Sequence, residues 1–360
     1  MGGALAVTGD NMIQRQIGDQ AATRLFGTTD AIERLKLGPI QRNFFSFCFQ
    51  LDSIDKSDHR KLFVKIPKTD LRRREATILP LSDQDKALAH EEVKSLRLLA
   101  DHWDGKSDNV EWIKVVDFLE ELNAIITERV DAVDAFSIFR SLDFRSRLGN
   151  CIQGNRLAGY MGRLGSALGR FHLQRYKTAT VSSPIIFPKI YFYCRELSRQ
   201  TRNPCLMKVP AALTKLEKLS FQTAETETFK GLDIRNVLIR GDNLFLLDPG
   251  KMKRSFREAD LARFIMTYRI LYWGSPLLLL LGTPGDNAEN SFVRGYSSHF
   301  PDMDSKLLDL YVLKEQLKHW HTALDSLSQK AWSPLVKSIA ARVYVNQFYE
   351  RQILQQMRKF

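Results

Sequence analysis

The chain has 360 residues, of which 44% are hydrophobic and 26% are charged. This composition excludes a disordered chain, a collagen and a coiled-coil array, and the length predicts two or three domains or one two-lobed unit. The 53 Lys and Arg residues outnumber the 41 Asp and Glu residues, which gives a net charge of +12. Such an excess favours phosphate-bearing or membrane-surface partners and says nothing about the fold.

The sequence shows neither a targeting segment nor a cysteine pattern typical of a zinc site or a disulfide framework. The first residues, MGGALAVTGDNM, lack a basic segment followed by an apolar run, so no signal peptide is predicted. The apolar stretch 264–282 is interrupted by Arg269, Gly274 and Pro276, which favours a buried helix and turn over a membrane span. The four cysteines have neither zinc-finger spacing nor the density of a disulfide framework. We therefore expect a soluble, cytoplasmic protein.

The first third of the chain predicts a β-rich lobe. Residues 1–30 are polar and lack periodicity, so we expect a loose lead-in before a nucleotide-binding N-lobe over 31–128. Alternating apolar residues predict strands, and apolar residues every three or four positions predict a helix. In chain order these are strands at 43–51 and 61–67, a helix at 83–103, and strands at 110–119 and 123–130.

The remainder, 129–360, is predicted to be a helical C-lobe with one embedded hairpin. Two short apolar runs, 236–239 and 244–247, flank the turn sequence RGDN and predict that hairpin. Residues 177–206 contain three prolines and are expected to form an irregular connection or insertion. Helices are predicted over 156–176 and 209–219 and from about 259, 306 and 334 onward. The expected class is α+β, with a small antiparallel β-rich lobe and a larger helical one.

Two charged residues in the first lobe suit a phosphate-binding pair. Lys65 lies in the middle of the strand FVKIP, where a solvated lysine is the plain alternative. Glu92 lies four residues after Leu88 and four before Leu96, so it shares the apolar face of its helix. A carboxylate on a buried face needs a cation, and Lys65 is the simplest candidate for its ion-pair partner. Glu91 is the rival carboxylate.

The stretch 229–250 suits a metal site. Asn236 directly precedes one strand of the predicted hairpin and Asp248 directly follows the other. Closure of the hairpin would bring both side chains to the same end, as a shared Mg²⁺ requires. Asp248, Pro249 and Gly250 also suit an ordinary turn. Asp260 could cap or brace the helix that follows.

Five landmarks over about 40–350 resemble the aminoglycoside and choline phosphotransferase superfamily of the protein-kinase-like fold, with lipopolysaccharide-sugar kinases as neighbours. They are FVKIP, EEVKSLRLL, LGSALGRFH, the hairpin IRNVLI to LFLLDPG followed by ADLARF, and FVRGY. The resemblance implies a two-lobed kinase-like fold that uses ATP and Mg²⁺. It implies that Lys65 and Glu92 anchor the phosphates and that Asn236 and Asp248 bind magnesium. It also implies that TERV at 127–130, which contains Glu128, is the hinge that carries the adenine.

The sequence departs from this family in the catalytic loop. The family reads His-Gly-Asp or His-x-Asp there, with the Asp five residues before the metal-binding Asn. In this sequence Gly231 lies five residues before Asn236, and the first carboxylate is Asp233, three residues before it. Either Asp233 takes the role of the base after a local shift, or the chain does not transfer phosphate in the ordinary way. Asp233 also suits a turn or a helix cap.

Two functions from different classes follow. The first is an ATP- and Mg²⁺-dependent phosphotransferase that acts on a hydroxyl of a small molecule or a glycan, with a cell-envelope sugar as one option. The second is a catalytically impaired kinase-fold protein that binds nucleotide or a partner. An anionic or lipid-linked acceptor and a peripheral membrane contact stay open, as do the oligomeric state and the pathway. A specific nucleic-acid partner is not expected, because the basic residues are scattered and lack interleaved aromatic residues.

Overall fold

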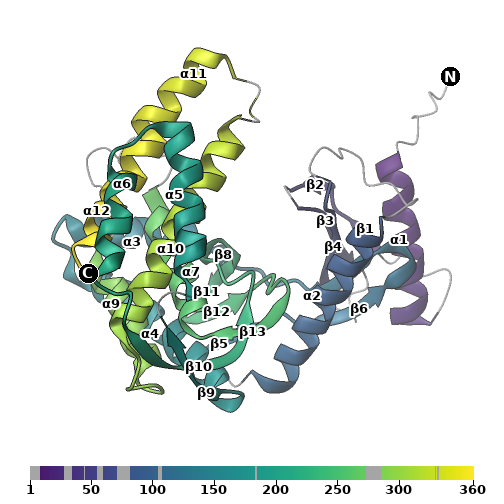
Figure 1. Ribbon diagram of the computed structural model, residues 1–360. Helices are drawn as coiled ribbons and strands as arrows, with labels where there is room; N and C mark the ends of the chain where they lie inside the picture. Colours follow the sequence, from purple (N-terminus) through teal and green to yellow (C-terminus); the bar gives the residue numbers. More distant parts are fainter. Residues whose placement is uncertain are drawn as a thin grey trace. The chain divides into compact units, whose positions relative to one another are not determined.

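The computed structural model describes residues 9–27, 35–43, 45–54, 60–70, 82–103, 108–182, 185–272, 285–328, 330 and 332–360. The chain divides into two compact units (Figure 1). Unit 1 comprises 1–103, 111–132 and 240–252, and unit 2 comprises 104–110, 133–239 and 253–360. Antiparallel sheets combined with many helices confirm the expected α+β class. Unit 1 includes residues 240–252, which the sequence did not assign to the first lobe.

Unit 1 is built on an antiparallel sheet with the strand order β1-β3-β4-β7-β6, in which β2 also pairs with β3. The strands are β1 (Leu35–Leu37), β2 (Gln41–Arg42), β3 (Ser46–Ser53), β4 (Lys61–Pro67), β6 (Val115–Leu119) and β7 (Ala124–Glu128). The central strand β4 covers the residues predicted for it, and its neighbours β3 and β7 match their predicted strands to within a few residues.

One face of this sheet packs against a helix that the sequence analysis missed. Residues 1–30 were expected to form a loose lead-in, but Gly9–Phe26 form the helix α1. Its residues Ile13, Ile17 and Ala21 are fully buried in one cluster with sheet residues such as Val64. Apolar residues every fourth position give α1 only a narrow apolar stripe, and the burial of that stripe against the sheet stabilises the helix.

The other face of the sheet is covered by α2 (Asp83–His102). Ala89 and Val93 of α2 pack against Ile125 of β7. The helix begins after Ser82, whose hydroxyl accepts a hydrogen bond from the backbone N–H of Asp85, as N-cap residues do. This cap and the apolar stripe fix which residues of α2 face the sheet.

Unit 2 is mainly helical. Its helices are α3 (Ala135–Arg147), α4 (Cys151–Gln174), α5 (Phe187–Thr201), α6 (Cys205–Thr214), α7 (Glu258–Arg269), α9 (Asp286–Ser297), α10 (Ser305–Ser328), α11 (Pro334–Ile339) and α12 (Gln347–Met357). The helix α10 packs against α5, α7 and α12. The helices α4 and α9 approach so closely that a Cβ on Gly165 would lie 2.0 Å from the carbonyl oxygen of Phe292. Glycine is required at this crossing.

The strands β9 (Lys177–Ser182), β10 (Ser220–Phe229) and β13 (Met252–Phe256) form a three-stranded sheet with the order β13-β10-β9. The strand β8 (Val133–Asp134) pairs with β11 (Val237–Arg240). The predicted hairpin strands are present as β11 and β12 (Asn243–Leu246), joined by a turn in which Gly241 has a φ of +60°. The remaining strand is β5 (Val110–Trp112).

The expectation for 177–206 was wrong, because this region forms β9 and α5. Of the apolar stretch 264–282, residues 264–272 are helical and the rest lies outside the described residues. Among the helices that the structure describes, none has the length and apolar character needed to cross a membrane. Cys48, Cys194 and Cys205 are buried free thiols, whereas Cys151 is exposed.

Candidate functional site

The predicted phosphate-binding pair is present in unit 1. The Nζ atom of Lys65 donates to both oxygens of Glu92, at 2.7 Å from Oε1 and 2.8 Å from Oε2. It also lies 2.9 Å from Oδ2 of Asp248. The side chain of Lys65 is 16% exposed and that of Glu92 is 5% exposed. One nearly buried ammonium is therefore shared by two carboxylates.

The strand and helix periodicities explain why these residues meet. Side chains alternate across a strand, so Lys65 points to the face opposite Val64. That is the face that α2 covers, and Lys65 pairs in register with Ile125, which packs against α2. Glu92 shares the buried side of α2. Glu91, the rival, is only half-buried, and its Oε2 lies 3.6 Å from Nζ of Lys251.

The partnership between Lys65 and Asp248 was not predicted. Asp248 follows β12 and adopts a φ of +48°, a left-handed conformation that Asp and Asn tolerate better than most residues. This backbone turn directs the carboxylate to Lys65 while 44% of the side chain remains exposed. A carboxylate that combines a fixed oxygen with solvent access suits a hard cation such as Mg²⁺, which binds through one or two carboxylates together with phosphate oxygens.

Electrostatics keep Lys65 charged. Burial alone would lower the pKa of Lys65, but the carboxylates of Glu92 and Asp248 outweigh burial and raise that pKa above its ordinary value. For Glu92, burial raises the pKa, Lys65 opposes the rise, and Asp248 adds to it. The ammonium is thus a permanent cation, placed where it can bind an anion such as a phosphate.

Glu128 lies at the end of β7 and is exposed. Its backbone N–H donates to the carbonyl of Lys114 at 3.0 Å, and the next residue, Arg129, donates to the carbonyl of Lys61 at 2.8 Å. The segment 127–130 therefore leaves the sheet in a fixed backbone conformation. Its role in carrying an adenine stays a prediction.

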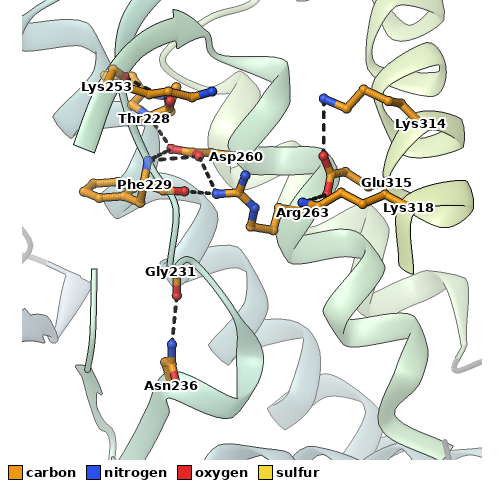
Figure 2. A network of polar contacts seen from close by, with 11 residues as sticks. Thr228, Phe229, Gly231, Asn236, Lys253, Asp260, Arg263, Lys314, Glu315 and Lys318 are labelled. Carbon is orange, nitrogen blue, oxygen red and sulfur yellow. Dashed lines mark hydrogen bonds and ion pairs between the residues drawn. The ribbon is translucent and has the colours of Figure 1, made fainter. Parts of the chain in front are cut away.

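In unit 2 the loop that follows β10 is held through its backbone by α7 (Figure 2). The N–H of Phe229 donates to both oxygens of Asp260, at 3.1 and 2.9 Å, and the guanidinium of Arg263 donates to the Phe229 carbonyl. Farther along, the N–H of Ile234 donates to the hydroxyl of Thr267 at 3.1 Å. Three side chains of one helix therefore fix the entry and the middle of the loop without using any of its side chains.

Asp260 is itself held in the core. It is fully buried, and its Oδ2 lies 3.3 Å from Nε2 of His172, which is also fully buried. Nδ1 of His172 lies 2.9 Å from the hydroxyl of Tyr296. The sequence analysis gave Asp260 a bracing role for its own helix, whereas the structure shows that it braces the loop at Phe229.

Asn236 and Asp233 lie in this loop, and each is fixed by a different contact. The side-chain amide of Asn236 donates to the carbonyl of Gly231 at 3.0 Å, which leaves the amide oxygen as the atom that could bind a metal (Figure 2). Asp233 caps a short 3₁₀ turn over Ile234–Asn236. Its Oδ1 accepts from the backbone N–H and the Nε of Arg235 at 2.9 and 2.8 Å, and its Oδ2 accepts from Nη2 of the same residue.

Carboxylate and amide oxygens are ligands that Mg²⁺ accepts, so the chemistry of Asp248 and Asn236 fits that ion. Asp248 belongs to unit 1 and Asn236 to unit 2. Their sharing of one metal ion stays a prediction.

A cluster of cations lies beside the loop, around one buried carboxylate (Figure 2). Glu315 of α10 is 2% exposed, and its oxygens lie 3.2 Å from Nζ of Lys314 and 2.9 Å from Nζ of Lys318. Burial would raise the pKa of Glu315, but Lys314, Lys318 and Arg263 lower it to about 2. Lys314 and Lys318 thus pair with Glu315, whereas Arg263, which binds the Phe229 carbonyl, lies 4.0 Å from Oδ1 of Asp260 and acts on Glu315 only through its charge.

Comparison with known proteins rests on structure alone, because neither a family model nor a curated protein matches the sequence. A choline kinase from Cryptosporidium parvum Iowa II aligns over 96% of each chain with a TM-score of 0.53 and 12% identity. A glucosamine kinase aligns over 90% of this chain and 94% of its own, with a TM-score of 0.51 and 10% identity. The chain has the protein-kinase-like fold. This result confirms the expected two-lobed kinase-like fold.

A choline/ethanolamine kinase family protein from Mesorhizobium loti gives the same picture, with 96% of this chain and 98% of its own covered, a TM-score of 0.50 and 12% identity. The high coverage shows that the likeness extends over both units of the chain.

The sequence analysis missed Arg263 and the cations of α10. The spacing of Asp260 and Arg263, three residues apart in ADLAR, would have placed both on one side of α7.

Proposed function

We propose that the protein is a cytoplasmic, ATP- and Mg²⁺-dependent phosphotransferase that acts on a hydroxyl group of a small molecule or glycan. The observation that carries the proposal is the ammonium of Lys65, held at 2.7 to 2.9 Å by Glu92 and Asp248. Phosphoryl transfer relies mainly on positioning and on electrostatic stabilisation of the phosphates, and such a lysine supplies both. The kinase-like fold and its small-molecule kinase neighbours support the same assignment.

In this proposal the site residues of unit 1 bind the nucleotide and share in binding the metal ion. Lys65 binds the α- and β-phosphates, and Glu92 keeps its ammonium in place. Glu128 and the residues around it carry the adenine. Asp248 of unit 1 and Asn236 of unit 2 bind Mg²⁺, which when bound neutralises charge on the phosphates.

The loop 229–236 would present the acceptor hydroxyl. Because Gly231 offers no side chain, Asp233 is the carboxylate that we assign to orient this hydroxyl. Its hydrogen bonds to Arg235 fix the carboxylate in one orientation. A carboxylate accepts about four hydrogen bonds, so the three from Arg235 leave room for one from a hydroxyl.

The cations beside this loop support an anionic acceptor. Lys314 and Lys318 pair with Glu315 and Arg263 pairs with Asp260, so three cations face two carboxylates, and Lys318 is the most exposed of the three cations. An acceptor that carries a phosphate or carboxylate would balance this excess positive charge, whereas a cationic acceptor would be repelled. A phosphorylated sugar, such as a component of a cell-envelope glycan, has both the hydroxyl and the charge.

One observation favours a second function, which is nucleotide binding without transfer. Arg235 donates to both oxygens of Asp233, so this carboxylate is already paired with a cation. An acceptor hydroxyl would have to compete with Arg235 for this carboxylate. In that case the protein would bind ATP through Lys65 and would act through a partner.

Calorimetric titration with ATP, with and without Mg²⁺, tests the proposal. Binding that requires Mg²⁺ and is weakened at least tenfold by Asp248→Asn is expected. Glu91→Gln, at the half-buried neighbour of Glu92 that does not contact Lys65, is the control that leaves affinity unchanged. Binding that is the same in the absence of Mg²⁺, or in Asp248→Asn, would overturn the metal assignment.

Turnover then separates the two functions. Release of ADP is measured with neutral sugars and with the corresponding sugar phosphates, for the wild type and for Asp233→Asn. We expect turnover with the anionic acceptors and a loss of about 10²- to 10⁴-fold in Asp233→Asn, the range that a general base contributes. Nucleotide binding without turnover on any acceptor would instead support the second function.

A further inference from the structure

A groove lies between α5 and α6 of unit 2, and neither the loop 229–236 nor the cation cluster takes part in it. The two helices pack against each other, and the groove has a volume of about 660 Å³. Its lining combines apolar residues with two arginines, among them Tyr191, Phe192, Arg195, Arg199, Leu206 and Met207. This volume falls within the range of about 300–1,000 Å³ typical of ligand sites.

Large apolar side chains are exposed along this groove. Met207 is 74% exposed and Phe192 is 46% exposed. The core sides of the two helices are supplied by other residues, such as Ile190, Leu197 and Val209, which are buried. The exposed residues therefore do not serve the packing of unit 2, and clustered exposed apolar residues mark an interaction surface.

The segment that contains α5 and α6 also carries an excess of positive charge. Residues 185–218 contain seven Lys and Arg but only two Glu, so this tenth of the chain holds almost half of its net charge of +12. Arg195 and Arg199 are largely exposed, and both contact the same carboxylate, Glu196, at 3.4 and 3.1 Å. Two guanidinium groups that share one carboxylate leave an excess positive charge at the edge of the groove.

We infer that the α5–α6 groove binds anionic lipid at a membrane surface, with the headgroup at Arg195 and Arg199 and apolar chain atoms against Phe192 and Met207. Exposed aromatic and aliphatic residues interleaved with Lys and Arg are the composition of segments that lie in the membrane interface. The cations attract anionic headgroups, and the apolar side chains leave water. A free phosphate ion would satisfy the arginines but leave the apolar lining exposed.

Sedimentation of the full chain with vesicles tests this inference. The protein is mixed with vesicles of phosphatidylcholine alone or with 30% phosphatidylserine added, at low and physiological salt. We expect binding only to the anionic vesicles, and weaker binding at higher salt. Replacing both arginines, Arg195→Gln with Arg199→Gln, should weaken partitioning about thirtyfold, since each basic side chain near such a surface contributes about 1 kcal/mol.

A second variant separates apolar contact with the lipid chains from contact with the headgroup charge alone. Phe192→Ser with Met207→Ser keeps every charge and should also weaken binding, because it removes the apolar contact. Arg145→Gln with Lys177→Gln removes two exposed cations elsewhere in unit 2 and should bind as the wild type does. Circular dichroism checks that each variant is folded.

Three results would overturn the inference. They are equal binding to neutral and anionic vesicles, wild-type binding by both groove variants, and loss of binding only when the exposed Leu335 and Ile339 of α11 are changed to Ser. A full effect of the arginine variant with no effect of the Phe192 and Met207 variant would limit the contact to headgroup charge and would overturn the assignment of apolar chain atoms to the groove. The experiment uses no nucleotide, so its outcome is independent of the proposed transferase activity.

Discussion

The ammonium of Lys65 faces two carboxylates whose surroundings differ, and this difference predicts opposite consequences for their removal. Glu92 is nearly buried and contacts the ammonium through both oxygens, whereas Asp248 is 44% exposed and contacts it through one. We therefore expect Glu92→Gln to damage stability and Asp248→Asn to damage Mg²⁺-dependent nucleotide binding. Each substitution removes one charge and retains the shape of the side chain.

The expected magnitudes follow from the contacts. Breaking a buried ion pair costs about 3–5 kcal/mol, because the remaining charge is left in a poorly hydrated place. Asp248 stays 2.9 Å from Lys65 in Glu92→Gln, so we expect the lower end, about 3 kcal/mol. An exposed pair contributes about 0–1 kcal/mol, and Asn tolerates the φ of +48° well, so Asp248→Asn should change stability by less than about 1 kcal/mol.

Urea unfolding followed by fluorescence measures these changes, since Trp103 and Trp112 both lie in unit 1. Glu91→Gln is the matched control, because it removes a neighbouring carboxylate from the same helix outside the Lys65 pair. It should change the free energy of unfolding by less than about 0.5 kcal/mol. Equal destabilisation by Glu92→Gln and Asp248→Asn would refute the division of roles between the two carboxylates, and so would a neutral Glu92→Gln.

Two further predictions concern unit 2. Gly165→Ala should destabilise by about 3 kcal/mol, since its Cβ would clash with the Phe292 carbonyl, whereas Gly159→Ala, with no described atom within 4 Å, should stabilise by up to about 1 kcal/mol. Denaturant midpoints measure both, and a common direction of change would contradict the packing. Glu315 has a pKa lowered from 4.5 to about 2, so its contribution to stability is complete above pH 4.5 and is lost as the pH falls towards 2. The difference in unfolding free energy between wild type and Glu315→Gln should shrink by about 2 kcal/mol from pH 7 to pH 3, and a constant difference would contradict the ion pairs.

In unit 1 the sequence predicted best those site residues whose face on a strand or helix follows from periodicity. The strand 61–67 alternates strictly enough to assign Lys65 to one face, and the spacing of Leu88, Glu92 and Leu96 assigns Glu92 to the apolar side of a helix. Both assignments use neighbours along the chain. The contact between Lys65 and Asp248 joins residues 183 positions apart, and no local pattern encodes it.

The sequence analysis missed a strand and a helix in which residue types that simple patterns do not expect occupy key positions. The strand β10 buries Thr223, Thr226 and Thr228 on its two faces, so neither face shows a regular alternation of apolar and polar residues. The prolines of 177–206 indicated an irregular connection, but Pro188 lies in the first turn of α5, where a proline costs no hydrogen bond. Threonine in β10 and proline in α5 are residue types that simple sequence patterns take as evidence against a buried strand and against a helix.

The contacts of α7 bear directly on whether the missing carboxylate at Gly231 matters. Asp260, Arg263 and Thr267 bind the loop only through its backbone, so the loop retains its shape whatever side chain stands at position 231.

Gly231→Asp therefore adds an acid without removing any of these contacts, and its effect on turnover measures how much of the role Asp233 already fills. If Asp233 orients the acceptor hydroxyl, as we propose, Gly231→Asp should raise turnover less than tenfold. A gain of 10²-fold or more, in the range of a newly supplied general base, would show that the wild-type loop lacks one and would favour nucleotide binding without transfer.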